Sequence, residues 1–232
     1  MNIRILDLIE GAKEATGVAV IIDVFRAFSL ECYIMNNNPK DLIAVGDSKI
    51  AYDYKKNNSD ALLVGERHGV MLDGFDYGNS PSALEFVKLD NKVVIHTTSA
   101  GTQGIINAKG ADIILTGSLV NASAIAKYIK DNNFSDVSLV CMGLEGTEKT
   151  EEDTLCAEYI KSLLLDNPLT NLNEQIESLK HTSGAKFFDI KNKDVFPKED
   201  FYLSTVVDRF NFVLKVIKKE DGFDHIERID II

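Results

Sequence analysis

The chain has 232 residues, which fits one large domain or two small ones. Hydrophobic residues make up 45% and charged residues 26%, values typical of a globular protein with a substantial core. Lys and Arg number 25 against 36 Asp and Glu, a net charge of −11 that disfavours nucleic acid and anionic membranes as partners. The same acidity is compatible with a divalent cation, because hard cations prefer carboxylates.

The sequence favours a cytoplasmic location. Asp7 and Glu10 interrupt any apolar signal-peptide core near the N-terminus. The longest clean apolar stretch, Val18–Ile22, is far too short to cross a bilayer. The cysteines are odd in number and widely spaced, which is typical of reduced thiols; they are Cys32, Cys141 and Cys156.

Short apolar runs alternate with helix-length segments over the first two thirds of the chain. The predicted strands are Val18–Asp23, Leu42–Val45, Ala61–Val64, Val93–His96, Asp112–Leu115 and Val137–Cys141. The predicted helices are Phe28–Asn36, Lys49–Lys56, Ser82–Val87, Gly104–Lys109 and Ser123–Lys130. Nearly continuous apolar strands are buried on both faces, so the pattern predicts an α/β fold of three layers, α/β/α, with a mostly parallel or mixed sheet.

The last third differs in pattern. A helix follows Thr150, with apolar residues spaced as one stripe from Leu155 to Leu164. A second helix is predicted from the apolar spacing between Leu203 and Ile217. We expect these C-terminal helices to pack on the same body, so that 1–232 forms a single unit. In an alternative organisation, this unit has two lobes of about 1–145 and 146–232, with the site between them. The face of the second helix fits either the core, which is favoured, or a contact in a homo-oligomer.

Polar residues gather where the predicted strands end. Ligands of parallel α/β sheets bind beyond the carboxyl ends of the strands. Asp23, Glu66 and Glu145 follow three of these strands and would converge on one rim. Their mutual repulsion would be offset by a cation or by Arg26 and Arg67, so metal ligation and ion pairing both remain open.

Several neighbouring segments could bind an anion. A guanidinium grips phosphate or sulfonate with two hydrogen bonds, so Arg26 and Arg67 are candidates. The segment Thr97–Thr102 leaves a strand and enters a helix, and Gly101 there allows a close backbone approach. Ser and Thr are also ordinary helix caps, and no P-loop spacing is present. Ser118 with Asn121 is a weaker candidate of the same kind.

The loop Leu72–Pro81 combines glycines, aspartates and aromatics and is typical of an active-site loop. Near the start of the C-terminal third, Thr150 and Asp153 have the spacing of a capping box. Glu152 or Asp153 as a site carboxylate is an equally weighted alternative. His68, beside Arg67, could act as an acid or a base.

Taken together, these segments resemble the 2-phosphosulfolactate phosphatase family over about residues 17–160. The matching motifs are Asp23-Val24-Phe25-Arg26-Ala27, Gly65-Glu66-Arg67, Gly74-Phe75-Asp76-Tyr77-Gly78-Asn79-Ser80-Pro81, Thr97-Thr98 with Gly101-Thr102, Gly117-Ser118 with Asn121-Ala122, and Glu152-Asp153-Thr154-Leu155-Cys156-Ala157. The sequence departs from the family at Phe28, where Thr is more common, and at Ser99 and Ala100, where Thr and Asn are. The amide missing at Ala100 bears on the substrate more than on the reaction.

The resemblance implies a Mg²⁺-dependent phosphomonoester hydrolase that converts 2-phospho-3-sulfolactate to 3-sulfolactate and phosphate, a step in coenzyme M biosynthesis. The implied catalytic residues are Asp23, Arg26, Glu66 and Asp76. Metal ligands are expected among Asp23, Glu66, Asp76 and Glu145. Substrate contacts are expected from Arg67, Asn79, Ser80, Thr97, Thr98, Ser99, Gly101, Thr102, Ser118 and Asn121. Two alternatives stay open: a phosphatase for another small phosphorylated carboxylate or sulfonate, and a non-enzymatic binder of small anions.

Overall fold

A computed structural model describes all residues, 1–232. One mixed sheet of ten strands runs through it, in the order β1-β8-β2-β7-β9-β10-β3-β6-β4-β5. The strands are β1 (Asn2–Asp7), β2 (Gly17–Ile22), β3 (Asp41–Ala44), β4 (Leu62–Arg67), β5 (Val70–Met71), β6 (Val93–Thr97), β7 (Ala111–Gly117), β8 (Asp136–Cys141), β9 (Phe212–Lys218) and β10 (Asp224–Asp230). All six predicted strands are therefore present, and the α/β fold class is confirmed.

The helices lie on both faces of the sheet. They are α1 (Leu8–Glu14), α2 (Ala27–Asn36), α3 (Ser48–Asn57), α4 (Pro81–Leu84), α5 (Gly101–Asn107), α6 (Ala122–Asp131), α7 (Glu151–Leu164), α8 (Leu172–Leu179) and α9 (Lys198–Thr205). No helix is long and apolar enough to cross a membrane.

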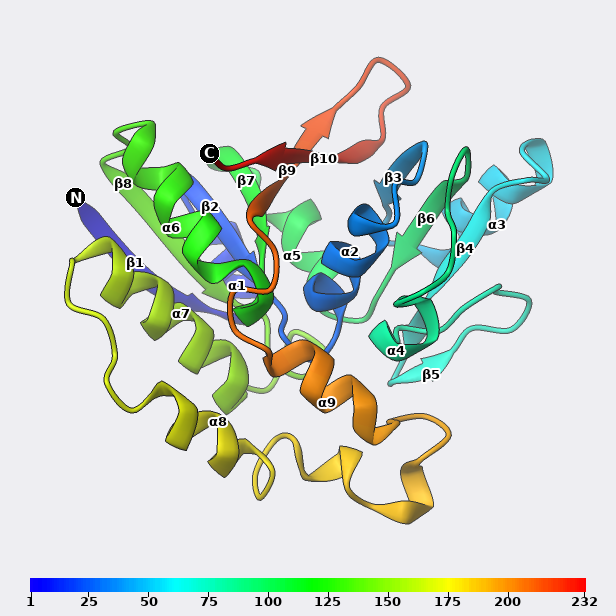
Figure 1. Ribbon diagram of the computed structural model, residues 1–232. Coiled ribbons are helices and arrows are strands. Elements are labelled where there is room, and N and C mark those ends of the chain that lie inside the picture. The colour runs from blue at the N-terminus through cyan, green and yellow to red at the C-terminus, as the bar shows by residue number, and fades with distance from the viewer.

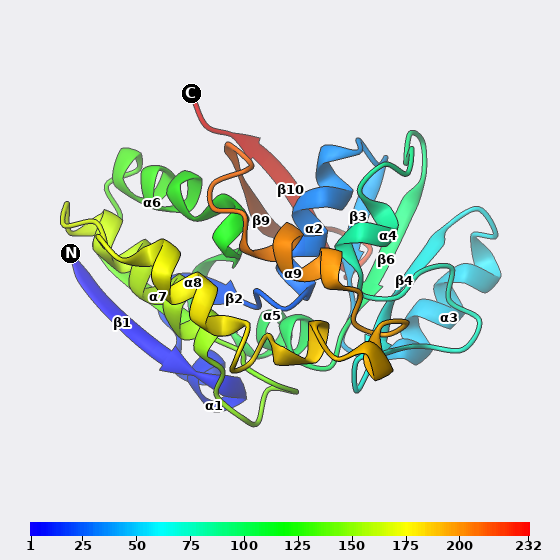
Figure 2. The same cartoon turned by 60° about the horizontal axis from the view of Figure 1, so that its bottom comes forward.

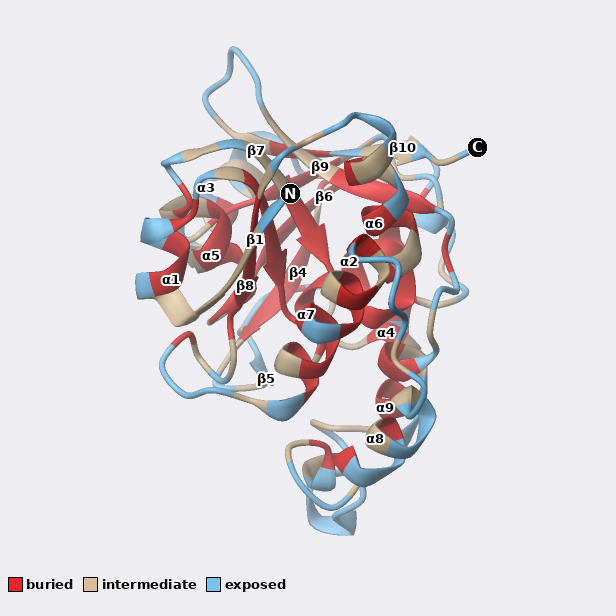
Figure 3. Ribbon diagram, turned by 90° about the vertical axis from the view of Figure 1, so that its left-hand side faces the viewer, coloured by how far each residue is buried: buried red, intermediate tan, exposed pale blue.

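Alternating side chains of β2 show why three layers form. Val18, Val20 and Ile22 pack into the core under α6 and α7, whereas Ala19 and Ile21 pack into the core on the side of α5. Because successive side chains of a strand point to opposite faces, a continuous apolar run must be covered on both. Figure 3 shows the result, with the central strands buried and exposed surface on the outer sides of the helices.

Two blocks of parallel strands are joined by an antiparallel hairpin. One block is β1-β8-β2-β7 and the other is β3-β6-β4. The hairpin β9-β10 pairs antiparallel with β7 on one side and with β3 on the other. Figure 1 shows the two blocks at an angle to each other, with the hairpin above and between them. The sheet is consequently mixed and strongly bent.

The predicted helix from Leu203 to Ile217 is wrong. Helix α9 ends at Thr205, and Phe212–Lys218 forms strand β9. Alternate residues of β9 enter opposite cores, Leu214 on one side and Val213 on the other. The apolar residues fit both a helical and a strand period here. The Asp-Gly turn at Asp221–Gly222, a strong hairpin signal, supports the strand.

The position of Leu214 gives a test of its burial in the core. Leu214→Ala should lower the free energy of unfolding by about 2–5 kcal/mol, because it removes a fully buried side chain. Leu165→Ala, at a position that is 55% exposed, is the matched control and should change it by less than ~0.5 kcal/mol. Urea unfolding measures both, and equal effects would contradict the burial of Leu214 in the core.

Candidate active site

The carboxyl ends of four strands converge on one cavity of about 570 Å³. It is lined by Asp23 after β2, Glu66 in β4, Ser99 after β6 and Gly143 after β8. The start of α7 adds Glu152. The opposite side is formed by residues 182–196, which we call the strap, between α8 and α9. Figure 2 shows the strap crossing the lower side of the molecule. Residues of both 1–145 and 146–232 thus line the cavity.

Asp23 lies at the floor of this cavity and is only 6% exposed. Its Oδ1 accepts a hydrogen bond from the backbone N–H of Ala27 at 3.2 Å. Burial raises the pKa of Asp23 to about 7, and the nearby charges of Glu66 and Glu152 add to the increase. At Gly101, a Cβ atom would lie 3.0 Å from Asp23 Oδ2, so this glycine lets the start of α5 approach the carboxylate.

Glu66 joins two loops at the cavity. Its Oε1 accepts from the backbone N–H of Ser99 at 2.7 Å, and its Oε2 accepts from Gly69 N–H at 2.6 Å. The Ser99 hydroxyl donates to the same Oε2 at 3.2 Å. Both oxygens are therefore occupied by protein donors. At the exposed rim, Glu145 pairs with His68 Nδ1 at 2.7 Å, and this hydrogen bond raises the pKa of His68.

The two acids at the start of α7 have different environments. Asp153 accepts from the backbone N–H groups of Val24 and Gly143, both at 2.8 Å, and so ties β2 and β8 to α7. Glu152 lines the cavity, and its buried Oε2 has no hydrogen-bond partner. Burial raises the pKa of both carboxyls. Thr150 makes no side-chain cap, so the capping-box interpretation is wrong.

Neither predicted arginine has all the N–H donors of its guanidinium free to bind an anion. Arg26 Nη1 donates to Asp200 and to the carbonyl of Val195, both at 2.8 Å, within a pair that is almost completely buried. Asp200 is held in turn by the hydroxyls of Ser80 and Ser82. Arg26 still lines the cavity. Its main contacts fasten the strap and α9 to α2.

Arg67 points away from the cavity. It donates to the carbonyls of Glu66 and Gly46 and to the Thr97 hydroxyl. Asp76 is also outside the cavity, where it accepts from Leu63 N–H at 2.7 Å and from Lys55 at 3.1 Å. The structure thus does not bring Asp76 to the other three acids of the predicted metal set.

Most of the predicted hydroxyl contacts stabilise turns instead of lining the cavity. Thr98 and Thr102 hydrogen-bond to each other across the first turn of α5. Ser118 and Asn121 form a capping box and are completely buried. Ser and Thr side chains satisfy unpaired backbone groups at helix starts, which is why the same residues suggest an anion loop. Of this predicted set, Asn79 and Ser99 do line the cavity.

Unpartnered polar atoms are concentrated at this cavity. In the whole chain, eight buried side-chain atoms lack a hydrogen-bond partner. Four of them belong to cavity-lining residues: Asn79 Oδ1, Thr150 Oγ1, Glu152 Oε2 and Ser183 Oγ. Each such group costs about 1–3 kcal/mol unless a ligand or water satisfies it. This concentration indicates a binding site for a polar ligand.

Sequence reasoning missed the contributions of the strap. Ser183, Lys186 and Phe196 line the cavity, but they lie in a stretch without a recognisable motif. Burial lowers the pKa of Lys186, while the nearby charge of Glu152 opposes this effect. Asp200 was missed as well. No pattern in the sequence places these residues opposite the strand ends.

The carboxylates at the cavity do not form a complete set of protein ligands for a metal ion. No three His, Cys, Asp or Glu side chains come together as a complete metal-binding group. Mg²⁺ does not require one, because it usually keeps several waters and takes one or two carboxylates. Asp23 and Glu152 face the same cavity, and the unpartnered Glu152 Oε2 and Asn79 Oδ1 are hard oxygen donors. The donor set fits a partly hydrated Mg²⁺ and does not fit a cage of protein ligands.

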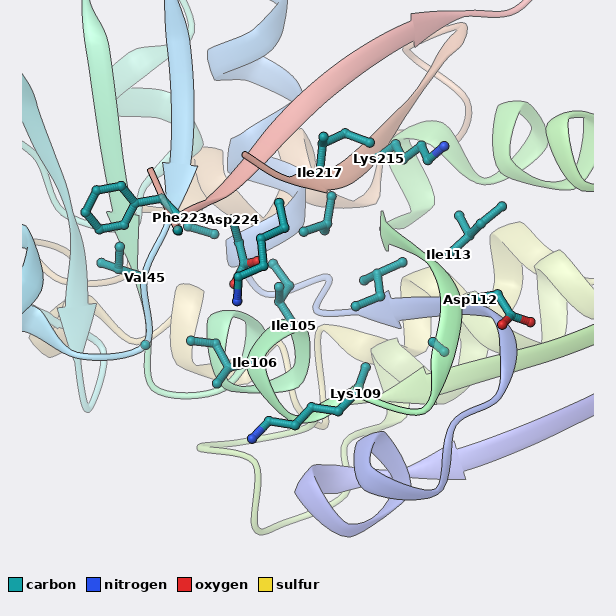
Figure 4. Close-up of a pocket in the computed structure, with 18 of the residues that line it drawn as sticks. Val45, Ile105, Ile106, Lys109, Asp112, Ile113, Lys215, Ile217, Phe223 and Asp224 are labelled. Carbon is teal, nitrogen blue, oxygen red and sulfur yellow. The ribbon is translucent and has the colours of Figure 1, made fainter. Parts of the chain in front are cut away.

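A second, larger cavity of about 740 Å³ lies between α5, β7 and the hairpin β9-β10. Figure 4 shows mainly apolar side chains around it, such as Ile105, Ile113 and Phe223, with Lys109, Lys215, Asp112 and Asp224 among them. It contains no cluster of buried carboxylates. The chemistry therefore points to the smaller cavity.

Comparisons with known proteins identify the family of the chain. The model of the 2-phosphosulpholactate phosphatase family matches residues 3–216. The chain belongs to this family. It is 38% identical over 73% of its length to a protein of Caldicellulosiruptor saccharolyticus, of which 71% is covered. It is 31% identical to a protein of Bacillus subtilis, with 92% of each chain covered. Both relatives are named "Probable 2-phosphosulfolactate phosphatase".

Membership of the 2-phosphosulpholactate phosphatase family confirms the resemblance seen in the sequence and the assignment as a phosphatase. The match extends beyond the motifs, over the whole strap and into β9.

The raised pKa of Asp23 predicts a stability gain on neutralisation. An acid whose pKa is higher in the folded state binds its proton more tightly there, so its contribution to stability falls as the pH rises from about 4 to about 7. Without added divalent cation, Asp23→Asn should raise the free energy of unfolding by ~1–3 kcal/mol at pH 8, and by less at pH 5. Urea unfolding at the two pH values measures this.

The exposed carboxylate of Asp131, which pairs with Lys127, gives the matched control for Asp23→Asn. Asp131→Asn should change the free energy of unfolding by less than ~0.5 kcal/mol at both pH values. A loss of stability in Asp23→Asn at pH 8 would show that the carboxylate is not destabilised by its burial.

Proposed function

We propose that the protein hydrolyses 2-phospho-3-sulfolactate to 3-sulfolactate and phosphate with the help of Mg²⁺. The proposal is carried by one observation: a cavity at the strand ends where buried carboxylates face unpartnered polar groups. The names of the relatives supply the substrate. We also propose a place in coenzyme M biosynthesis and a cytoplasmic location, the latter supported by three buried, unpaired cysteines.

Asp23 and Glu152 are the residues that would hold Mg²⁺. The ion would supply Lewis-acid stabilisation of charge on the phosphoryl oxygens when bound. Their raised pKa values show that the cavity disfavours two bare negative charges. A cation relieves this cost, since it compensates the buried charge. The acids that repel each other in this cavity therefore favour a cation between them.

The remaining residues orient the reacting groups. Glu66 fixes the loops after β4 and β6, and Asp153 fixes those after β2 and β8, so both hold the cavity walls at set positions. Preorganised walls matter because dipoles already in place need no rearrangement as the phosphoryl charge develops. The nucleophile is either an oriented water or a carboxylate. The Asp-x-Asp pattern of aspartyl phosphatases is absent at Asp23, since Phe25 follows, which favours water.

Phosphate release from 2-phosphosulfolactate tests the function. With Mg²⁺, the protein should release phosphate, and a chelator should abolish the release. Asp23→Asn should lower kcat/KM at least ~100-fold, because it removes a carboxylate from the reaction cavity. Asp76→Asn should retain activity within ~5-fold, because Asp76 lies outside the cavity. Equal losses in both variants would contradict the assignment.

A panel of phosphomonoester substrates distinguishes the proposed function from the two alternative functions. Release from other phosphorylated carboxylates or sulfonates, but not from 2-phosphosulfolactate, would replace the proposed substrate. Absence of turnover on every phosphomonoester, with phosphate binding intact, would favour an anion-binding protein.

Mg²⁺ binding has a readout independent of turnover. At a concentration about 100 times its Kd, a ligand that binds only the folded state stabilises it by about 2.7 kcal/mol. Mg²⁺ should therefore raise the melting temperature of the protein, and Glu152→Gln should reduce this shift by more than half. Glu158→Gln, on an exposed turn of the same helix, is the matched control. An undiminished shift in Glu152→Gln would remove that residue from the metal site.

A further inference from the structure

Lys186 differs from every other cationic side chain at the cavity. Arg26 is paired with Asp200, and Lys149 is paired with Asp7 at 2.6 Å. His68 is hydrogen-bonded to Glu145. Lys186 Nζ makes no hydrogen bond and no ion pair with the protein, although it has three N–H donors. It is therefore the cavity's one uncommitted cation.

Three aromatic rings hold the Lys186 ammonium in place without satisfying its donors. Nζ lies 5.9 Å from the ring centroid of Phe25, 5.6 Å from that of Phe187 and 5.4 Å from that of Phe196. Aromatic faces attract a cation but do not accept conventional hydrogen bonds. The rings also exclude water, so the ammonium is poorly solvated. An anion in the cavity would replace the missing solvation.

Two further features indicate which ligand group Lys186 would bind. Lys186 lines the same cavity as Asp23 and Glu152, so the ammonium shares this cavity with the acids of the candidate metal site. Ser183, three residues earlier on the strap, has a buried Oγ with no partner and lines the same cavity. The uncommitted Lys186 ammonium and the Ser183 hydroxyl, which lies beside the Glu152 carboxylate, form a site for an oxyanion that also contacts a cation.

We propose that Lys186, assisted by the Ser183 hydroxyl, binds the phosphoryl group of the substrate. The inference rests on the proposed function, because it assigns the anion partner of the same cavity. The phosphoryl group is the part of the substrate that must approach Asp23 and Glu152 for hydrolysis. Their negative charges would repel a phosphate dianion, and the uncommitted ammonium beside them offsets this repulsion. The two arginines contribute mainly to the walls.

Lys186→Met tests the proposal, since it removes the charge and keeps an apolar side chain among the rings. With Mg²⁺, kcat/KM should fall roughly 100-fold on 2-phosphosulfolactate. The fall should be similar on p-nitrophenyl phosphate, which has no sulfonate. Binding of inorganic phosphate to the metal-free protein, followed by ³¹P NMR titration, should weaken about 10-fold or more. Lys186→Arg should restore part of both, and the melting temperature should stay within a few degrees.

The matched control is Lys191→Met, which removes an exposed lysine of the same strap outside the cavity. It should leave both kcat/KM and phosphate binding unchanged. Values for Lys186→Met equal to those of this control would overturn the proposal. A loss confined to the sulfonate-bearing substrate would also overturn it, by assigning Lys186 to the sulfonate. So would a large fall in melting temperature that Lys186→Arg does not repair, because it would show a structural role.

Failure of the proposed function can be distinguished from failure of the Lys186 proposal. If the unmodified protein hydrolyses no phosphomonoester, the proposed function fails. Phosphate binding that still depends on Lys186 would then support the anion site on its own.

Discussion

The burial of several carboxylates around one cavity is the constraint on which the structure depends. Asp23, Glu66, Glu152 and Asp153 are each no more than 6% exposed. Charges in such a position are costly unless they are neutralised, paired or hydrogen-bonded. Glu66 and Asp153 are satisfied by backbone N–H groups of four different loops. Burial raises the pKa of Asp23, Glu152 and Asp153, and of these three only Asp23 and Glu152 line the cavity, where a ligand can compensate their charge.

The wall opposite these acids is attached by another buried pair. Arg26 and Asp200 are 3% and 0% exposed and join the segment after β2 to α9. A buried pair of this kind gives little net stability against an apolar replacement, but breaking it leaves an isolated charge. Its structural consequence is the position of the strap: Arg26 also bonds Val195 and lies 4.8 Å from the ring of Phe196. The placement of Lys186 opposite Asp23 follows from this attachment.

The sequence was sufficient for six of the ten strands, for their order along the chain and for the acids at their ends. Continuous apolar runs such as Val18–Ile22 permit few other structures. It was insufficient where two patterns coincide, as at Val213 and Leu214, whose spacing suits both a helix and a strand. These two residues form a strand because β9 lies in the middle of the sheet, between β7 and β10. Hydroxyls such as Thr98 and Ser118 were ambiguous for a different reason, because capping and anion binding need the same groups.

Lys186 could not be predicted, because its role depends on contacts between distant parts of the chain. Nothing near it in sequence distinguishes it from the exposed Lys191. The distinction arises when the strap brings Lys186 among the rings of Phe25, Phe187 and Phe196. There it shares the cavity with Asp23, which lies about 160 residues earlier in the chain, and with Glu152. Motifs at strand ends thus supply the acids and their supports, whereas the uncommitted donors come from a segment without motifs. A change at Lys186 would therefore weaken the binding of the phosphoryl group while leaving the carboxylates in place.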